Sequence, residues 1–281
     1  MNRPARRRLV SRFMVGLMVL AVVAAVLPLF LILASLVTRG AGALSLSFFT
    51  NMPVPVGEIG GGVLHAVVGT LIIVGMASLV GVPVGIAAGL YCTEFAGTRL
   101  ATVTRFVADV LNGTPSIVVG VFAWTWVVVS QKQFSAFAGS VALAVLMVPM
   151  VMRTTEELLK LVPVSLREAA LALGYSRWRT SLSVVLRTAL PGIVTGTLLS
   201  VARISGETAP LLFTALGSEF LSTNIDRPMA ALPLVVFKYA SSPYPEWHQL
   251  AWTAALVLIL VVLLLSIAAR VVTRQRFSRR D

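Results

Sequence analysis

Two charged residues, Arg203 and Glu207, interrupt an apolar stretch that runs from about Leu190 to Phe213. A guanidinium offers forked donors that suit an oxyanion, and a charge inside a membrane segment usually faces a partner or a wet cavity. Residues four apart share one face of a helix, so the two charges could form a structural ion pair. The alternative is a solute pathway, which the polar side chains of Ser205 and Thr208 would also line. Both interpretations stay open.

The chain lacks the motifs of an enzyme that works alone. A phosphate-binding loop needs Gly-Lys-Ser/Thr, whereas Lys132, Lys160 and Lys238 follow Gln, Leu and Phe. Cys92 is the single cysteine, the two histidines lie far apart, and no Gly-x-Ser-x-Gly occurs. We therefore expect no catalytic site, no metal site and no cofactor in this chain.

A second polar stretch, Ser165–Gly174, predicts a short helix. Ser165 and Glu168 match a capping box at its start, and Gly174 can end it in the left-handed conformation. The residues expected to share its apolar face are Leu166, Ala169 or Ala170, and Leu173.

Two roles are open for this short helix. It could dock into a groove on a soluble partner, or lie on lipid headgroups together with Arg167, Arg177 and Arg179. Ser176 can cap a second helix directly after Gly174. A helix, a glycine and a second helix form a rigid, protruding corner, which favours docking.

Composition indicates a membrane protein. Of the 281 residues 57% are hydrophobic and only 12% are charged, whereas soluble domains carry roughly 25% charged residues. The apolar runs predict an all-α, polytopic fold with six transmembrane helices. The expected spans are 13–38, 63–90, 115–130, 136–152, 190–213 and 250–269. Residues 94–109 are expected to be a polar connector, and Thr114 to be the N-cap of the third span. Asp109 and Asn112 could be solute ligands, but caps or turns explain them more simply.

The basic residues predict the orientation of these spans. Eighteen of the 23 Lys and Arg residues lie at the two ends and in the loops 91–109 and 153–189. Because basic loops stay in the cytoplasm, both termini and Ser165–Gly174 are predicted to be cytoplasmic. The net charge of +12 then reflects topology and not nucleic-acid binding. The predicted divisions are a basic N-terminus (1–12), a first transmembrane helix (13–38) and a transmembrane domain (63–272) with a cytoplasmic loop (153–189) and an external loop (214–248).

One motif resembles a known family. Glu168, Ala169, Ala170 and then Gly174, in a cytoplasmic loop before the penultimate span, are similar to the EAA loop of ABC-importer permeases. In that family the loop forms a coupling helix that inserts into a cleft on the nucleotide-binding subunit. The family pattern continues to Ile-x-Leu-Pro, whereas this chain has Val184–Arg187 there and a proline only at Pro191.

Three further segments resemble the PstA type of permease, a subunit of the high-affinity phosphate importer: Asn112–Gly120, Ala202–Thr214 and Leu232–Phe237. The likeness covers roughly residues 60–272, and it implies the fold of type I ABC importers. It also implies that Arg203 and Glu207 match residues associated with phosphate passage. The implied partners are a related permease (PstC type), two ATPase subunits that bind ATP and Mg²⁺ (PstB type) and an external phosphate-binding protein (PstS type).

The sequence therefore predicts a phosphate permease subunit in the cytoplasmic (inner) membrane of a bacterium or archaeon. One alternative is an ABC permease for sulfate, molybdate or phosphonate, which would differ only around Arg203. The other is a secondary carrier or channel, which would need its own ion-coupling groups and no docking loop. Replacement of Glu168 and Gly174 would abolish transport by an ABC permease and leave such a carrier unaffected.

Overall fold

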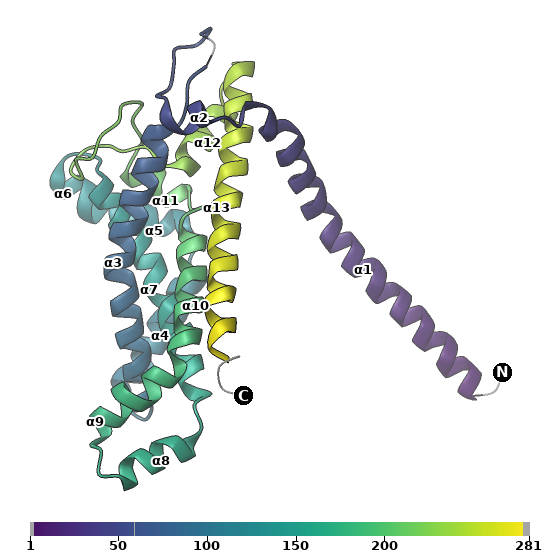
Figure 1. The fold of residues 1–281 in the computed structure, drawn as a ribbon, viewed down its shortest axis with the longest axis vertical. Coiled ribbons are helices and arrows are strands. Elements are labelled where there is room, and N and C mark those ends of the chain that lie inside the picture. The colour runs from purple at the N-terminus through teal and green to yellow at the C-terminus, as the bar shows by residue number, and fades with distance from the viewer. Residues whose placement is uncertain (1–2, 59, 278–281) are drawn as a thin grey trace.

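The computed structural model describes residues 3–58 and 60–277, which form a helical bundle (Figure 1). Among the described residues the only β-structure is one isolated bridge between Leu216 and Met229. The helices are α1 (Arg3–Gly40), η1 (Ala41–Ala43), α2 (Leu46–Thr50), α3 (Leu64–Glu94), α4 (Arg99–Gly113), α5 (Ser116–Ala123), η2 (Trp124–Val128), α6 (Val129–Gln131), α7 (Ala136–Lys160), α8 (Val164–Ala172), α9 (Arg177–Thr180), η3 (Ser181–Val185), α10 (Leu186–Ile204), α11 (Ala209–Thr214), α12 (Leu232–Ala240) and α13 (Pro245–Phe277). Arg279 and Arg280, part of the predicted basic C-terminus, lie outside the described residues.

Five helical stretches are long and apolar enough to cross a membrane: Val10–Ala43, Leu64–Glu94, Ala136–Lys160, Arg177–Ile204 and Pro245–Val271. A sixth candidate is a bent pair, in which α4 meets the helix of α5, η2 and α6 at 106°. The start of α1, the end of α13 and α8 all lie at the same end of the bundle in Figure 1. This arrangement agrees with an even number of crossings and confirms the predicted all-α membrane fold.

The third predicted span, 115–130, matches the helix Ser116–Gln131, but the stretch before it differs from the prediction. Most of the expected connector 94–109 is helix α4, which places Asp109 inside a helix and not at a cap. Thr114 ends α4, and Pro115 is the residue before α5, so Thr114 is not the N-cap of the third span. Proline disfavours a helical conformation for the residue before it, which explains why the chain breaks at this point.

The fifth predicted span was wrong at both ends. The helix begins at Arg177 and ends at Ile204, well before Phe213. A break at residues 205–208 follows, and the chain re-enters a helix at α11, with Pro210 in its first turn. Proline fits the first turn of a helix because its missing amide has no intrahelical partner there.

Helix α3 lies directly against α7 along much of its length (Figure 1). A Cβ atom added at Gly85 would lie 2.7 Å from Val151 Cβ, and one added at Gly89 would lie 2.7 Å from the Met152 carbonyl oxygen. Lipid chains are as apolar as the helices, so such close backbone approach is what holds membrane helices together. These two helices therefore form the centre of the bundle.

Helix α1 stands apart from this bundle over most of its length (Figure 1). It meets α13 only near Gly40, where Thr253 donates a hydrogen bond of 2.9 Å to the Gly40 carbonyl. None of its most apolar window is buried by the described residues. An apolar helix of this kind is stable in lipid or against a partner subunit.

The α3–α7 contact predicts that one of two glycine-to-alanine substitutions on α3 is destabilising and the other is not. We expect Gly89→Ala to lower the free energy of unfolding by about 1–3 kcal/mol, because its Cβ would overlap backbone of α7. Gly75→Ala is the matched control, since nothing lies within 4 Å of its added Cβ. Thermal unfolding of the purified protein in detergent measures both. Equal melting temperatures for the two variants would contradict the packing.

Candidate functional site

A cavity of about 220 Å³ lies where two breaks in the transmembrane helices meet. One break separates α4 from α5, and the other follows the end of α10. Its lining residues are Leu111, Asn112, Thr114, Pro115, Ser116, Leu146, Met150, Arg203 and Glu207. Non-helical backbone at membrane depth is tolerated where it is buried in protein or lines a wet cavity. Residues from both breaks line the same cavity, so the non-helical backbone of each is accommodated there.

The contact between α5 and α11 brings the two breaks together. A Cβ atom at Gly120 would lie 2.6 Å from Pro210 Cα, so the two helices touch backbone to backbone. Each of these helices begins directly after one of the breaks. Only glycine allows this approach, and it places residues far apart in sequence around one cavity.

The structure places Arg203 and Glu207 in this cavity but not on one helix. Arg203 is in the last turn of α10, where a positive charge interacts favourably with the helix dipole. Glu207 lies in the break beyond Ile204. The two side chains therefore do not share a helical face, and no ion pair joins them in the described part of the chain. The structural interpretation based on an i, i+4 pair was wrong.

The other two predicted pathway residues do not line the cavity. Ser205 is buried, and its hydroxyl donates a 2.7 Å hydrogen bond to the Val201 carbonyl. Thr208 is the residue before α11 and makes no side-chain cap there. Both residues lie in the break between α10 and α11, and the sequence did not reveal this break.

Sequence reasoning gave no pathway role to Thr114 and Ser116, and it preferred a cap or turn over a solute ligand for Asn112. The Asn-Gly-Thr-Pro-Ser stretch was interpreted as a turn, which it also is. The signal that could have identified them is a turn of polar residues between two apolar helices, because such a turn at membrane depth needs a cavity.

The cavity combines groups that suit a tetrahedral oxyanion. The guanidinium of Arg203 can donate two parallel hydrogen bonds, and the hydroxyl of Ser116 can donate or accept. The Thr114 hydroxyl donates to the Val110 carbonyl oxygen and can still accept. Glu207 adds an acceptor, which suits an anion that still carries a proton. Arg203 itself is exposed in the isolated chain, so the site is open on one side.

The second predicted site, Ser165–Gly174, is helix α8, at the same end of the bundle as the start of α1 (Figure 1). The predicted capping box was wrong, because α8 begins one residue earlier with Pro163 at the N-cap and no side-chain cap. The predicted C-terminus was correct. Gly174 has a φ of 82°, and the amides of Gly174 and Tyr175 donate to the carbonyls of Leu171 and Ala170. This is the Schellman arrangement that ends a helix at a glycine.

Helix α8 presents an apolar face to its surroundings. Leu166 and Leu173 are 41% and 79% exposed, and Glu168 and Ala169 are exposed beside them. Ala170 is buried against the chain's own fold, so Ala169 and not Ala170 belongs to the free face. Ser176 caps the next helix as predicted, accepting a hydrogen bond from the Arg179 amide.

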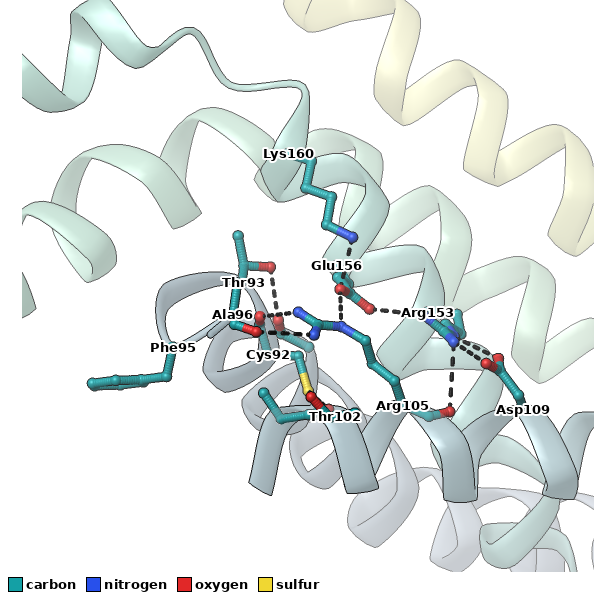
Figure 2. A network of polar contacts seen from close by, with 12 residues as sticks. Cys92, Thr93, Phe95, Ala96, Thr102, Arg105, Asp109, Arg153, Glu156 and Lys160 are labelled. Carbon is teal, nitrogen blue, oxygen red and sulfur yellow. Dashed lines mark hydrogen bonds and ion pairs between the residues drawn. The ribbon is translucent and has the colours of Figure 1, made fainter. Parts of the chain in front are cut away.

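Near α8, a group of charged residues joins α4 to α7; we call it the Glu156 cluster (Figure 2). Its members are Arg105, Asp109, Arg153, Glu156 and Lys160. Glu156 has a side chain only 1% exposed and pairs with Arg105 at 2.6 Å, Arg153 at 3.1 Å and Lys160 at 2.7 Å. Asp109 pairs with Arg153 rather than capping a helix, which corrects the prediction.

Comparison with known proteins identifies the family. Residues 81–278 match the family described as "Binding-protein-dependent transport system inner membrane component". The chain belongs to this family. The matched region contains both helix breaks that form the cavity, the Glu156 cluster and α8. The family consists of membrane components without a catalytic site of their own.

The relatives of this permease include proteins named "Phosphate transport system permease protein PstA". The protein of Yersinia pestis is 51% identical over 242 residues, 86% of this chain and 82% of that protein. The protein of Haemophilus influenzae is 46% identical over 265 residues, 94% of both chains. The resemblance to the PstA type is therefore confirmed.

Solved structures confirm the fold. The permease is similar to a chain of the inward-facing MetNI methionine ABC transporter, with a TM-score of 0.63, 22% identity, and coverage of 75% of this chain and 96% of that chain. A chain of an amino acid ABC transporter aligns with a TM-score of 0.58 at 16% identity, over 76% of this chain and 92% of that chain. The type I importer permease fold thus holds for the region that carries both sites.

The Glu156 cluster predicts a large difference between two neighbouring glutamates. We expect Glu156→Ala to lower the free energy of unfolding of the permease by about 3–5 kcal/mol, because it removes the acidic partner of Arg105 and Lys160 at a buried position. Glu157→Ala removes the same group from an exposed position and should change it by less than about 0.5 kcal/mol. Melting curves in detergent compare the two, and an equally stable Glu156→Ala protein would contradict the assigned ion pairs.

Proposed function

We propose that this chain is the membrane-spanning permease subunit that moves inorganic phosphate across the cytoplasmic membrane in an ATP-driven importer. The observation that carries the proposal is the cavity, in which Arg203 meets the polar turn between α4 and α5. It occurs in a chain that matches phosphate permeases over most of its length. A phosphate ion fits the donors that this cavity offers.

The proposed partners follow from what the chain lacks. It has no phosphate-binding loop for ATP, so two separate ATPase subunits of the PstB type would hold ATP and Mg²⁺. Its cavity is open where Arg203 is exposed, so a related permease of the PstC type would complete the pathway. An external phosphate-binding protein of the PstS type would dock on the loops 39–62 and 214–248.

We propose that α8 is the element that receives the ATPase movement. Leu166 and Leu173 would enter an apolar groove of the ATPase, and Glu168 would meet its polar rim. Ser165 lies in the first turn of α8, and Gly174 turns the chain back toward α9. The basic loops place α8 and both termini on the cytoplasmic side.

Reconstitution tests this function together with the role of Arg203. The complex is purified with its ATPase subunits, inserted into vesicles and supplied with binding protein, and phosphate uptake and ATP hydrolysis are measured. We expect phosphate to stimulate both. Arg203→Gln should lower uptake about 10–100-fold, because it removes charged hydrogen bonds to the anion.

The controls separate a specific role from a general loss of charge. Arg12→Gln removes an exposed arginine near the start of α1, away from the cavity and the proposed docking surfaces, and should leave uptake unchanged. Arg203→Lys keeps the charge but loses the fork, so an intermediate rate is expected. No stimulation by phosphate in the parent complex would refute the proposed function, and stimulation by sulfate, molybdate or phosphonate instead would reassign the solute.

Glu207 predicts how phosphate is distinguished from sulfate. Hydrogen phosphate can donate a hydrogen bond to this carboxylate, whereas sulfate carries no proton and would leave two negative groups facing each other. We expect Glu207→Gln to raise sulfate uptake relative to phosphate uptake by about tenfold, since the amide can donate. Competition between the two labelled anions measures the ratio. A ratio equal to that of the parent would overturn this role.

A further inference from the structure

Arg167 of helix α8 makes polar contacts with two transmembrane helices. Its Nη1 donates to Glu94 Oε1 at 2.5 Å, and its Nη2 donates to the Leu159 carbonyl oxygen at 3.3 Å. Glu94 is the last residue of α3, and Leu159 lies in the last turn of α7. A single guanidinium therefore joins α8 to the same end of two transmembrane helices.

Neighbouring residues of α8 face opposite ways. Arg167 and Ala170, three residues apart, turn toward the body of the protein, while Glu168 is exposed. The side chains of the ion pair are shielded, at 23% exposure for Arg167 and 20% for Glu94. A half-buried, charge-assisted contact is stronger than one between freely solvated side chains. One side of α8 is thus held by its own subunit, and the other stays free for the ATPase.

The inner end of α3 is held from a second direction. Arg105 of the Glu156 cluster donates to the Cys92 carbonyl oxygen at 2.5 Å and to the Ala96 carbonyl oxygen at 3.3 Å (Figure 2). The same guanidinium pairs with Glu156 of α7. The ends of α3 and α7 and the middle of α4 therefore form one connected unit, and Arg167 links α8 to it.

This unit leads back to the phosphate cavity. Helices α3 and α7 are in close backbone contact where Gly89 meets Met152. On α7, Met150 and Leu146, two and six residues before Met152, form part of the cavity wall. A displacement of α8 that reached α7 would therefore also move this wall relative to Arg203 on α10.

We propose that Arg167 is a positioning residue that transmits the movement of α8 to the α3–α7 pair through Glu94 and the Leu159 carbonyl. This inference rests on the proposed function, because it takes α8 as the ATPase-docking element. It assigns the transmission to a contact outside the docking face. Arg167, one of the three arginines that could have lain on lipid headgroups, instead pairs with Glu94 of the same chain.

The test measures phosphate molecules transported per ATP hydrolysed, a ratio that does not depend on how much complex assembles. We expect Arg167→Gln and Glu94→Gln each to lower this ratio about tenfold while ATP hydrolysis continues. Arg177→Gln is the matched control, since it removes an exposed arginine from the same loop and should leave the ratio unchanged. The exchanged pair, Glu94→Arg with Arg167→Glu, restores the ion pair but not the hydrogen bond to the Leu159 carbonyl, so it should raise the ratio about threefold above that of the single variants.

A second measurement keeps this proposal separate from the identity of the solute. Hydrogen exchange of residues 164–172 in the purified complex should become faster in Arg167→Gln and return toward the parent rate in the exchanged pair. Unchanged exchange would overturn the proposal even if the complex transported another anion. A lower melting temperature with an unchanged ratio would show that Arg167 is structural only. An exchanged pair whose ratio is no higher than that of the single variants would also refute the proposal. Absence of phosphate uptake by the parent complex would refute the proposed function instead.

Discussion

Glycines on one face of α3 let its backbone lie against α7, with Gly85 against Val151 and Gly89 against the Met152 carbonyl. In lipid no hydrophobic effect drives two apolar helices together, so this approach has to supply the cohesion through van der Waals contact. The other features are positioned by it. Helix α7 carries Met150 in the cavity wall and Glu156 in the charged cluster, and both stay in register with α3 because the pair cannot slide.

The charges of the protein fall into two kinds, and the difference separates structure from function. Glu156 is buried and satisfied by three cations, which costs desolvation but leaves nothing free to bind a solute. Arg203 and Glu207 line a cavity, and no ion pair joins them to each other in the described part of the chain. Charges kept at membrane depth without a structural partner are expected to serve a solute or its pathway.

Local patterns predicted whatever depends on a few neighbouring residues. Gly174 ends α8 and Ser176 caps α9, because a left-handed glycine and a serine cap need only the adjacent turn. The capping box at Ser165 failed, since the helix could begin a residue earlier after Pro163. The link from Arg167 to Glu94 could not be predicted, because 73 positions separate the two residues.

The amino-acid sequence by itself determined a helical membrane protein, a short helix that ends at Gly174, and two charged residues, Arg203 and Glu207, within an apolar stretch. Hydropathy and turn residues depend on short stretches of sequence, so they predict these properties without the tertiary structure. Only the tertiary structure decided that Arg203 and Glu207 lie at a helix break instead of on one helical face. It also decided that the turn at 112–116 shares their cavity, because that meeting depends on the backbone contact between Gly120 and Pro210.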